Sequence, residues 1–233
     1  AHHQQTPGSG QKGDGCSAAR CAAGGGLGVE ICKELQVIDG IDSGVVIEKQ
    51  QVICEAINCH NLNIKGIGEF RAEVDADFVD ISGEACFESY ITCDKITVRN
   101  KCVCKNSLLT TSLRILGVMA VYGRLNSENI IVNGALKFRG NVKTSAFLVR
   151  HGSLAKGSAK LKTSNCVVNG VLNNSGEVIS DEFKICSNKM SRIQEIRTDK
   201  FTVKNGTISL ANRVFLNSEY SSIIIPDSVE YIN

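Results

Sequence analysis

The chain has no tryptophan, only two prolines and few aromatic residues, which make up 5% of its 233 residues. No run of about 18 apolar residues is present, so we expect no transmembrane helix. The net charge is +2 at pH 7, so no strong charge of one sign directs the chain to nucleic acid or to acidic membranes. These absences exclude collagen, coiled coils and membrane-spanning helices, and they leave the function open.

Cysteine, in contrast, is abundant. The 11 cysteines are odd in number and run from Cys16 to Cys186, whereas a disulfide framework belongs to short secreted chains with paired spacings. We therefore predict reduced thiols, a cytoplasmic location and small buried cysteines, with no metal and no cofactor. Cys16 and Cys21 are the exception, since exposed thiols there remain open to modification. Three close pairs lack the spacing of a zinc site: Cys16 and Cys21, Cys54 and Cys59, Cys102 and Cys104.

Apolar residues return every 17 positions. The clearest row is Ile47, Ile64, Ile81, Val98, Ile115, Val132 and Val149. A second row lies two positions earlier, from Val45 and Leu62 to Phe147. Further rows in phase are Phe70, Phe87, Cys104, Val121, Phe138 and Gly66, Gly83, Asn100, Gly117, Gly134. Such self-similarity is typical of a solenoid.

Within one repeat the apolar residues alternate with polar ones, as in Leu62-Asn63-Ile64, and this period of two indicates β-strands. We predict an all-β fold, a single-stranded parallel β-helix with about 17 residues and about three short strands per coil. The Gly and Asn row marks corners, because these residues tolerate a positive φ. The predicted core ladder contains Leu62, Ile64, Val79, Ile81, Phe87, Val98, Ile115, Val132 and Val149.

Three regions follow from this pattern. Residues 1–30 are rich in glycine and poor in large apolar side chains, so we predict a flexible tail. Residues 31–163 are predicted to form the regular solenoid, with an imperfect capping coil from Ile31 to Ile38. The register slips after Arg150, and residues 153–163 carry about two extra positions. Residues 164–233 are predicted to continue as less regular coils and to end in a cap or contact segment.

Residues with catalytic potential are few. His60 and His151 are the only histidines within the clear coils, and we expect His151 to be an exposed corner residue, because one histidine without a positioned partner is not a general base. Asp77 and Asp94 stack in one row, but the rest of that row is polar and typical of solvated turns. We therefore expect a protein that is not an enzyme, and we keep a β-helix polysaccharide enzyme as the weakest alternative.

The charges are unevenly distributed. Acidic residues greatly outnumber basic ones between Glu30 and Asp94, whereas none occurs between Asn129 and Gly176. This is either an uneven solvated surface or a field that aids partner choice, including an anionic envelope surface. Nucleic acid is not expected, because aromatic residues for base stacking are scarce. The basic patch consists of Lys137, Arg139, Lys143, Arg150, Lys156, Lys160 and Lys162.

The ends of a solenoid carry unpaired backbone groups and exposed ladder residues, so each end can template another copy unless it is capped. We expect the ends near Ile31–Ile47 and Ile208–Ile225. No phosphate-binding loop of the Gly-x4-Gly-Lys type is present, and end-to-end pairing needs none. The candidate polymer contacts are Val37, Val45, Ile47, Phe215, Ile223 and Ile224.

The repeats Leu62-x-Ile64-x-Gly66, Val79-x-Ile81-x-Gly83, Leu113-x-Ile115-x-Gly117 and Ile130-x-Val132-x-Gly134 resemble the bactofilins, bacterial cytoskeletal proteins with a β-solenoid core. The resemblance covers about residues 40–150. It implies a right-handed solenoid that forms filaments without nucleotide and scaffolds the cell envelope at the inner face of the membrane. It also implies homopolymer contacts and membrane-associated or cell-wall-associated partners. The alternative is a surface or extracellular β-helix binding module, such as an adhesin or a carbohydrate binder.

Overall fold

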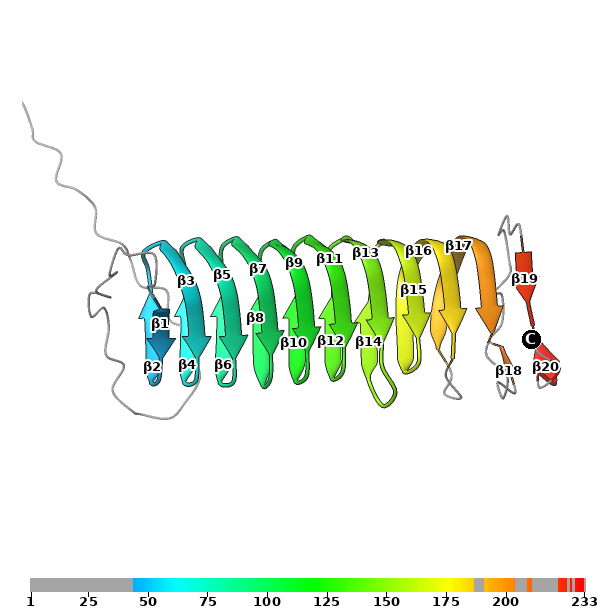
Figure 1. Ribbon diagram of the computed structural model, residues 1–233, viewed down its shortest axis with the longest axis horizontal. Helices are drawn as coiled ribbons and strands as arrows, with labels where there is room; N and C mark the ends of the chain where they lie inside the picture. The colour runs from blue at the N-terminus through cyan, green and yellow to red at the C-terminus, as the bar shows by residue number, and fades with distance from the viewer. Residues whose placement is uncertain are drawn as a thin grey trace, which may run out of the picture.

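The computed structural model describes residues 44–186, 191–203, 209–210, 222–225, 227 and 229–232, and every regular element in these residues is a β-strand. The strands stack as successive coils along the long axis of a rod (Figure 1). Residues one coil apart pair in parallel, and about nine turns form one β-solenoid. The predicted all-β solenoid is therefore confirmed.

Most coils contain one strand of eight residues and one of four. In chain order the strands are β1 (Gly44–Ile47), β2 (Gln50–Ile53), β3 (Ile57–Ile64), β4 (Ile67–Phe70), β5 (Val74–Ile81), β6 (Glu84–Phe87), β7 (Ile91–Val98), β8 (Lys101–Cys104), β9 (Leu108–Ile115), β10 (Val118–Val121), β11 (Leu125–Val132), β12 (Ala135–Phe138), β13 (Val142–Val149), β14 (Leu154–Gly157), β15 (Leu161–Val168), β16 (Val171–Ile185), β17 (Arg192–Val203), β18 (Ser209–Leu210), β19 (Ser222–Ile224) and β20 (Tyr231–Ile232).

Each regular coil contains two strands and not the three that were predicted. The difference arises because one long strand turns a corner and stays paired on both sides of it. In β5, Val74 and Ala76 point inward, Asp77 and Phe78 both point outward, and the alternation then resumes. Pairing with β7 continues on both sides of this corner. Each coil therefore has three sides, two from the long strand and one from the short strand.

The predicted ladder forms the core. All nine of its residues are at most 2% exposed. Identical rows stack in register, as in Ile64 beside Ile81, and Phe70 and Phe87 stack with their ring centroids 4.6 Å apart. Burial of these side chains contributes about 1.5–3 kcal/mol each, so stacking of coils is the main source of stability.

The glycine row does mark a corner, but positive φ is not the reason. Among the described glycines only Gly152 has a positive φ, of 77°. A Cβ at Gly134 would instead overlap the carbonyl oxygen of Gly117 in the preceding coil. At Asn100, where the row has a side chain, the amide nitrogen lies 3.3 Å from the Ile81 oxygen, whereas the equivalent distance from Gly83 to Ile64 is 2.8 Å. The row needs glycine because neighbouring backbones approach closely here.

The two extra positions lie between Val149 and Leu154. Val149 pairs with Val132, 17 positions earlier, whereas Leu154 pairs with Ala135, 19 positions earlier. His151 and Gly152 form an exposed turn within this segment. Ser153, two positions after His151, therefore occupies the glycine row beside Gly134.

The solenoid continues beyond residue 163. β15, β16 and β17 pair in parallel up to Val203, and the register shifts between Asn174 and Glu177. β17 then pairs with β19, while β18 and β20 form a separate pair. The predicted tail and the capping coil before residue 44 lie outside the described residues.

Candidate interaction surfaces

A row of buried hydroxyl groups runs beneath one side of the rod. The Thr144 hydroxyl lies 3.0 Å from the Glu128 carbonyl oxygen in the preceding coil and 2.9 Å from that of Ala146 in its own coil, so it donates to both acceptors in turn. Each hydroxyl thereby ties two coils together at the corner of the long strand. The same arrangement recurs at Thr110, Ser127, Thr163, Ser180 and Thr198.

This hydroxyl row is not among the rows predicted from the sequence. The period of 17 does contain it, because Ala76 and Cys93 occupy the same row in the first coils. The neighbouring polar row of Asp77 and Asp94 is predicted to form solvated turns and these hydroxyl residues have no predicted role, whereas the structure places them inside. The signal that could have found them is a polar row in phase with the apolar ladder.

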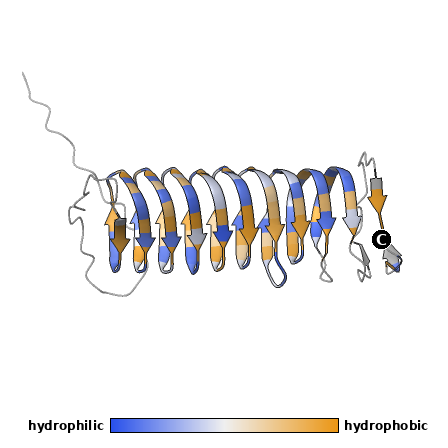
Figure 2. Cartoon of the chain, in the orientation of Figure 1, coloured by the Kyte–Doolittle hydropathy of each residue, from blue (hydrophilic) through white to orange (hydrophobic). Residues whose placement is uncertain are grey.

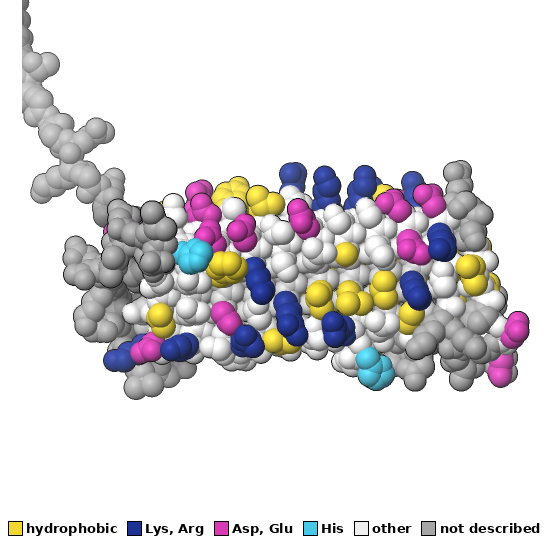
Figure 3. Space-filling view, in the orientation of Figure 1, with side chains coloured by type: hydrophobic (Ala, Val, Ile, Leu, Met, Phe, Trp, Pro, Cys, Tyr) yellow, Lys and Arg dark blue, Asp and Glu magenta, His cyan; other side chains and the backbone are white. Residues whose placement is uncertain are grey.

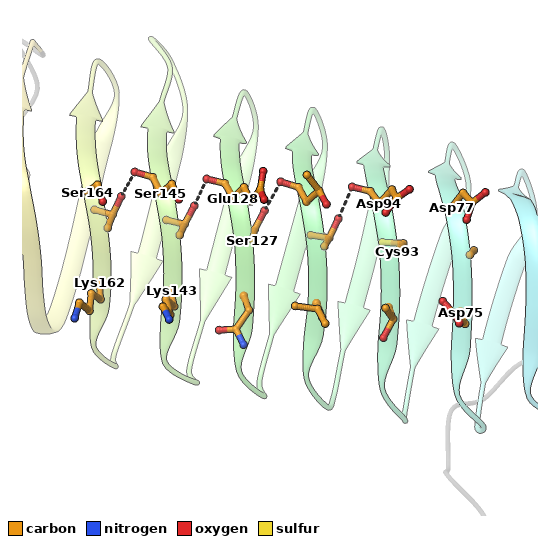
Figure 4. Close-up of a pocket in the computed structure, with 18 of the residues that line it drawn as sticks. Asp75, Asp77, Cys93, Asp94, Ser127, Glu128, Lys143, Ser145, Lys162 and Ser164 are labelled. Atoms are coloured by element: carbon orange, nitrogen blue, oxygen red, sulfur yellow. Dashed lines mark hydrogen bonds between the residues drawn. The ribbon is translucent and has the colours of Figure 1, made fainter.

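Above the hydroxyl row lies a long groove with a volume of about 870 Å³. One rim is the outward row of the first half of the long strands. The opposite rim is the corner row, and Figure 4 shows the two rims on either side of the buried row. We call this side of the rod the groove face and define it by its first rim: Asp75, Thr92, Leu109, Asn126, Lys143 and Lys162.

Charge changes sign along the groove face. Asp75 lies near the N-terminal end of the groove face. Lys143 lies four coils further along the rod, and Lys162 lies beside Lys143 in the next coil. On the opposite rim Asp77 and Asp94 flank the acidic part, and Ser145 and Ser164 flank the lysines (Figure 4). Two further acids, Glu128 near the middle and Asp181 beyond Ser164, also line the groove. Among the described residues neither lysine forms an ion pair.

The predicted basic patch is not a single surface. All seven residues are exposed, but they lie on different strands. Lys143 and Lys162 are neighbours on the long strands β13 and β15, whereas Lys137 and Lys156 are neighbours on the short strands β12 and β14. These strands form different sides of the coil. Lys160 binds Glu177 at 3.0 Å, and the Arg139 guanidinium lies 5.0 Å from the centre of the Tyr122 ring. Arg150 lies at the corner after β13.

The acidic part of the chain is compensated by bases from neighbouring coils. Lys101 lies 2.7 Å from Glu84, and the pair is separated by one coil. Arg99 binds Asp80 through two nitrogens, and this hydrogen bonding raises the pKa of the guanidinium. Charges of both signs therefore cover the side of the rod shown in Figure 3, with hydrophobic side chains between them. The outward apolar residues Leu116, Ile131 and Leu148 are half-buried.

At the N-terminal end, β1 pairs with β3 and β2 pairs with β4, and no described strand covers their outer edges. Val45 is half-buried and packs against the core. Ile47 is fully buried in register with Ile64, so this candidate contact belongs to the core ladder and not to an exposed tip. Val37 lies outside the described residues.

At the C-terminal end, β19 pairs with β17 through Phe201 and Ile223, and no described strand covers its other edge. Ile223, Ile224 and Ile225 are 43%, 49% and 38% exposed. Figure 2 shows this strand as a hydrophobic element at the tip of the rod. The two isoleucines predicted as contacts, Ile223 and Ile224, are therefore accessible, whereas Phe215 lies outside the described residues.

The residues considered for catalysis do not assemble into a catalytic constellation in the described part of the chain. His60 binds Asp77 across one coil and packs edge-on against Phe78, and Asp94 lies exposed at the next corner. His151 is exposed in its turn. No group of three or more His, Cys, Asp or Glu side chains that could hold a metal occurs among the described residues. The described residues contain no helix that is long and apolar enough to span a membrane.

Eight described cysteines are free thiols, and five of them are buried. Cys104 fills the phenylalanine row and Cys93 the row of Ala76, as predicted. Burial raises the pKa of the Cys93 thiol to about 11, although the Thr110 hydroxyl opposes the shift. Burial also raises the pKa of Cys166.

Comparison with known proteins gives no match: no family model, no curated protein and no solved structure is significantly similar to this chain.

Proposed function

We propose that this chain is a structural protein that assembles end to end into filaments without a nucleotide. The observation that carries the proposal is β19, whose Ile223 and Ile224 are exposed together with Ile225 directly after the strand, and whose outer edge no described strand covers. Open strand edges beside apolar residues favour pairing with another chain. At the opposite end, β1 and β2 offer edges of the same kind.

The energetics favour such a joint. Adding a coil to a solenoid continues the backbone hydrogen bonds and buries apolar ladder residues, and each repeat needs a neighbour for stability. Burial of three half-exposed isoleucines supplies a few kcal/mol at about 25 cal/mol per Å². The joint therefore extends interactions that the coils already make.

The resemblance to the bactofilins supports the same proposal and adds a setting. Filaments of this kind would act as a scaffold inside a bacterial cell, at the inner face of the membrane, with envelope-associated proteins as partners. The fold of the described residues is compatible with this role, which depends on the assembly itself.

Electron microscopy of the purified chain tests the proposal. We expect uniform filaments without added nucleotide, and short particles when Ile223→Asp and Ile224→Asp place charges on the outer strand. The matched control is Ile67→Asp with Val118→Asp, two apolar residues that are 47% and 56% exposed on strands paired on both edges. A monodisperse wild-type monomer, or an end variant that forms filaments as wild type does, would overturn the proposal.

A further inference from the structure

We propose that the groove face is a second interface, independent of the rod ends, through which two copies pair side by side in antiparallel orientation. The first observation is the order of side chains on its rim. From Asp75 to Lys162 the six residues change from acidic through uncharged to basic, at one residue per coil. When a second copy lies antiparallel to the first, the acidic end of each row therefore faces the basic end of the other.

The register of the pairing follows from this order. A two-fold axis between the coils of Leu109 and Asn126 places Asp75 opposite Lys162 of the second copy. The same axis places Thr92 opposite Lys143 of the second copy, with the Asp94 carboxylate on the other rim of that coil. Both pairs of facing residues are related by the same two-fold axis. One symmetric dimer therefore forms both contacts, as an isologous interface requires.

The apolar content of the rim lies at this axis. Leu109 is 53% exposed and is the one apolar residue among the six that define the groove face. In the antiparallel register it approaches its own counterpart one coil away, at about 4.8 Å along the rod. An apolar contact at the centre with charged pairs around it is the usual anatomy of a specific interface.

The groove also provides room for the lysines. At the acidic end its floor consists of Ala76 and Cys93, with Asp75 on one rim and Asp77 and Asp94 on the other (Figure 4). A lysine side chain from the second copy can lie in this part of the groove between carboxylates. Its long stem packs along the floor while the ammonium group reaches the acids.

A mixing experiment by sedimentation velocity at low salt tests the pairing. Every protein in it is the full chain carrying Ile223→Asp and Ile224→Asp, so the readout does not depend on whether the ends assemble. One variant adds Lys143→Glu and Lys162→Glu, which makes the groove face acidic throughout. The other adds Asp75→Lys and Asp94→Lys, which makes both parts basic.

We expect the parent to form dimers and each charge variant alone to associate at least about 30-fold more weakly, because like charges face each other. An equimolar mixture of the two variants should form dimers again. The matched control, Lys137→Glu with Lys156→Glu, makes the same charge change on a register pair of the short strands and should leave the dimer unaffected.

A monomeric parent at low salt would overturn the proposal. So would dimers of the acidic variant alone, or a mixture that stays monomeric. Circular dichroism should show unchanged strand content in every variant, since the substituted side chains are exposed. A photo-cross-linking residue at Leu109 provides a second readout: in the parent it should join residues 109–128 of the second copy, and cross-links elsewhere would contradict the register.

Discussion

At the scale of the residue, the interior is specified by rows and not by single side chains. Cys93, Thr110 and Ser127 follow one another in the same row, yet the first is a thiol and the others donate hydrogen bonds to two carbonyl groups. A hydroxyl satisfies the corner carbonyls, whereas a thiol is a weak donor. The early coils therefore rely more on apolar packing at this corner than the later ones.

This difference predicts a pH effect at Cys93. Its thiol is neutral in the fold, and its pKa of about 11 lies above the ordinary value of 9.0. The stabilisation is complete below pH 9 and is lost as the pH rises toward 11, at a cost of about 2 kcal/mol. In Cys93→Thr this part of the alkaline destabilisation should disappear, because threonine does not ionise there and fits the row.

Urea unfolding at pH 8 and pH 10.5 measures the effect, and Cys54→Ser, which removes an exposed thiol, is the control. Equal alkaline losses in wild type and Cys93→Thr would show that the thiol is not buried as described.

At the scale of the element, the corner after each long strand limits what the coil can contain. The glycine row places backbone against backbone, so that a Cβ at Gly134 would overlap the carbonyl group of Gly117. A side chain at such a position requires the local backbone to shift, and the coils around Asn100 keep their parallel register.

Gly134→Ala tests the corner. The added Cβ would overlap the Gly117 carbonyl group, so the free energy of unfolding should fall by about 1–3 kcal/mol. Gly44→Ala is the control, since its nearest neighbours would lie 3.9 Å away. Thermal unfolding of both variants measures the difference, and equal stabilities would refute the close approach.

Much of this element-level structure could be predicted from the sequence. The period of 17 identified Leu62, Ile64 and their counterparts as the core, because every coil repeats one geometry. The polar row of Asp77 and Asp94 did mark a corner, but the sequence could not show that one long strand pairs on both sides of it, because a break in alternation is equally typical of a strand end. Ile47 was misplaced because position near an end was taken for exposure. The groove escaped notice because its buried hydroxyls resemble turn residues in composition.

At the scale of the whole molecule, the rod has two kinds of open surface. Its ends present strand edges, with exposed Ile223 and Ile224 at one of them. Its groove face presents a charge order that is complementary to its own reverse. End-to-end joining would lengthen the rod, and pairing through the groove face would widen it, so the two interfaces predict separable changes in the dimensions of an assembly.

X-ray fibre diffraction from aligned filaments tests the central claim most directly. If coils stack through each joint, the strands lie across the filament axis, and a strong reflection at about 4.8 Å should fall on the meridian. A 4.8 Å reflection on the equator, or a preparation in which no filaments form, would contradict the account.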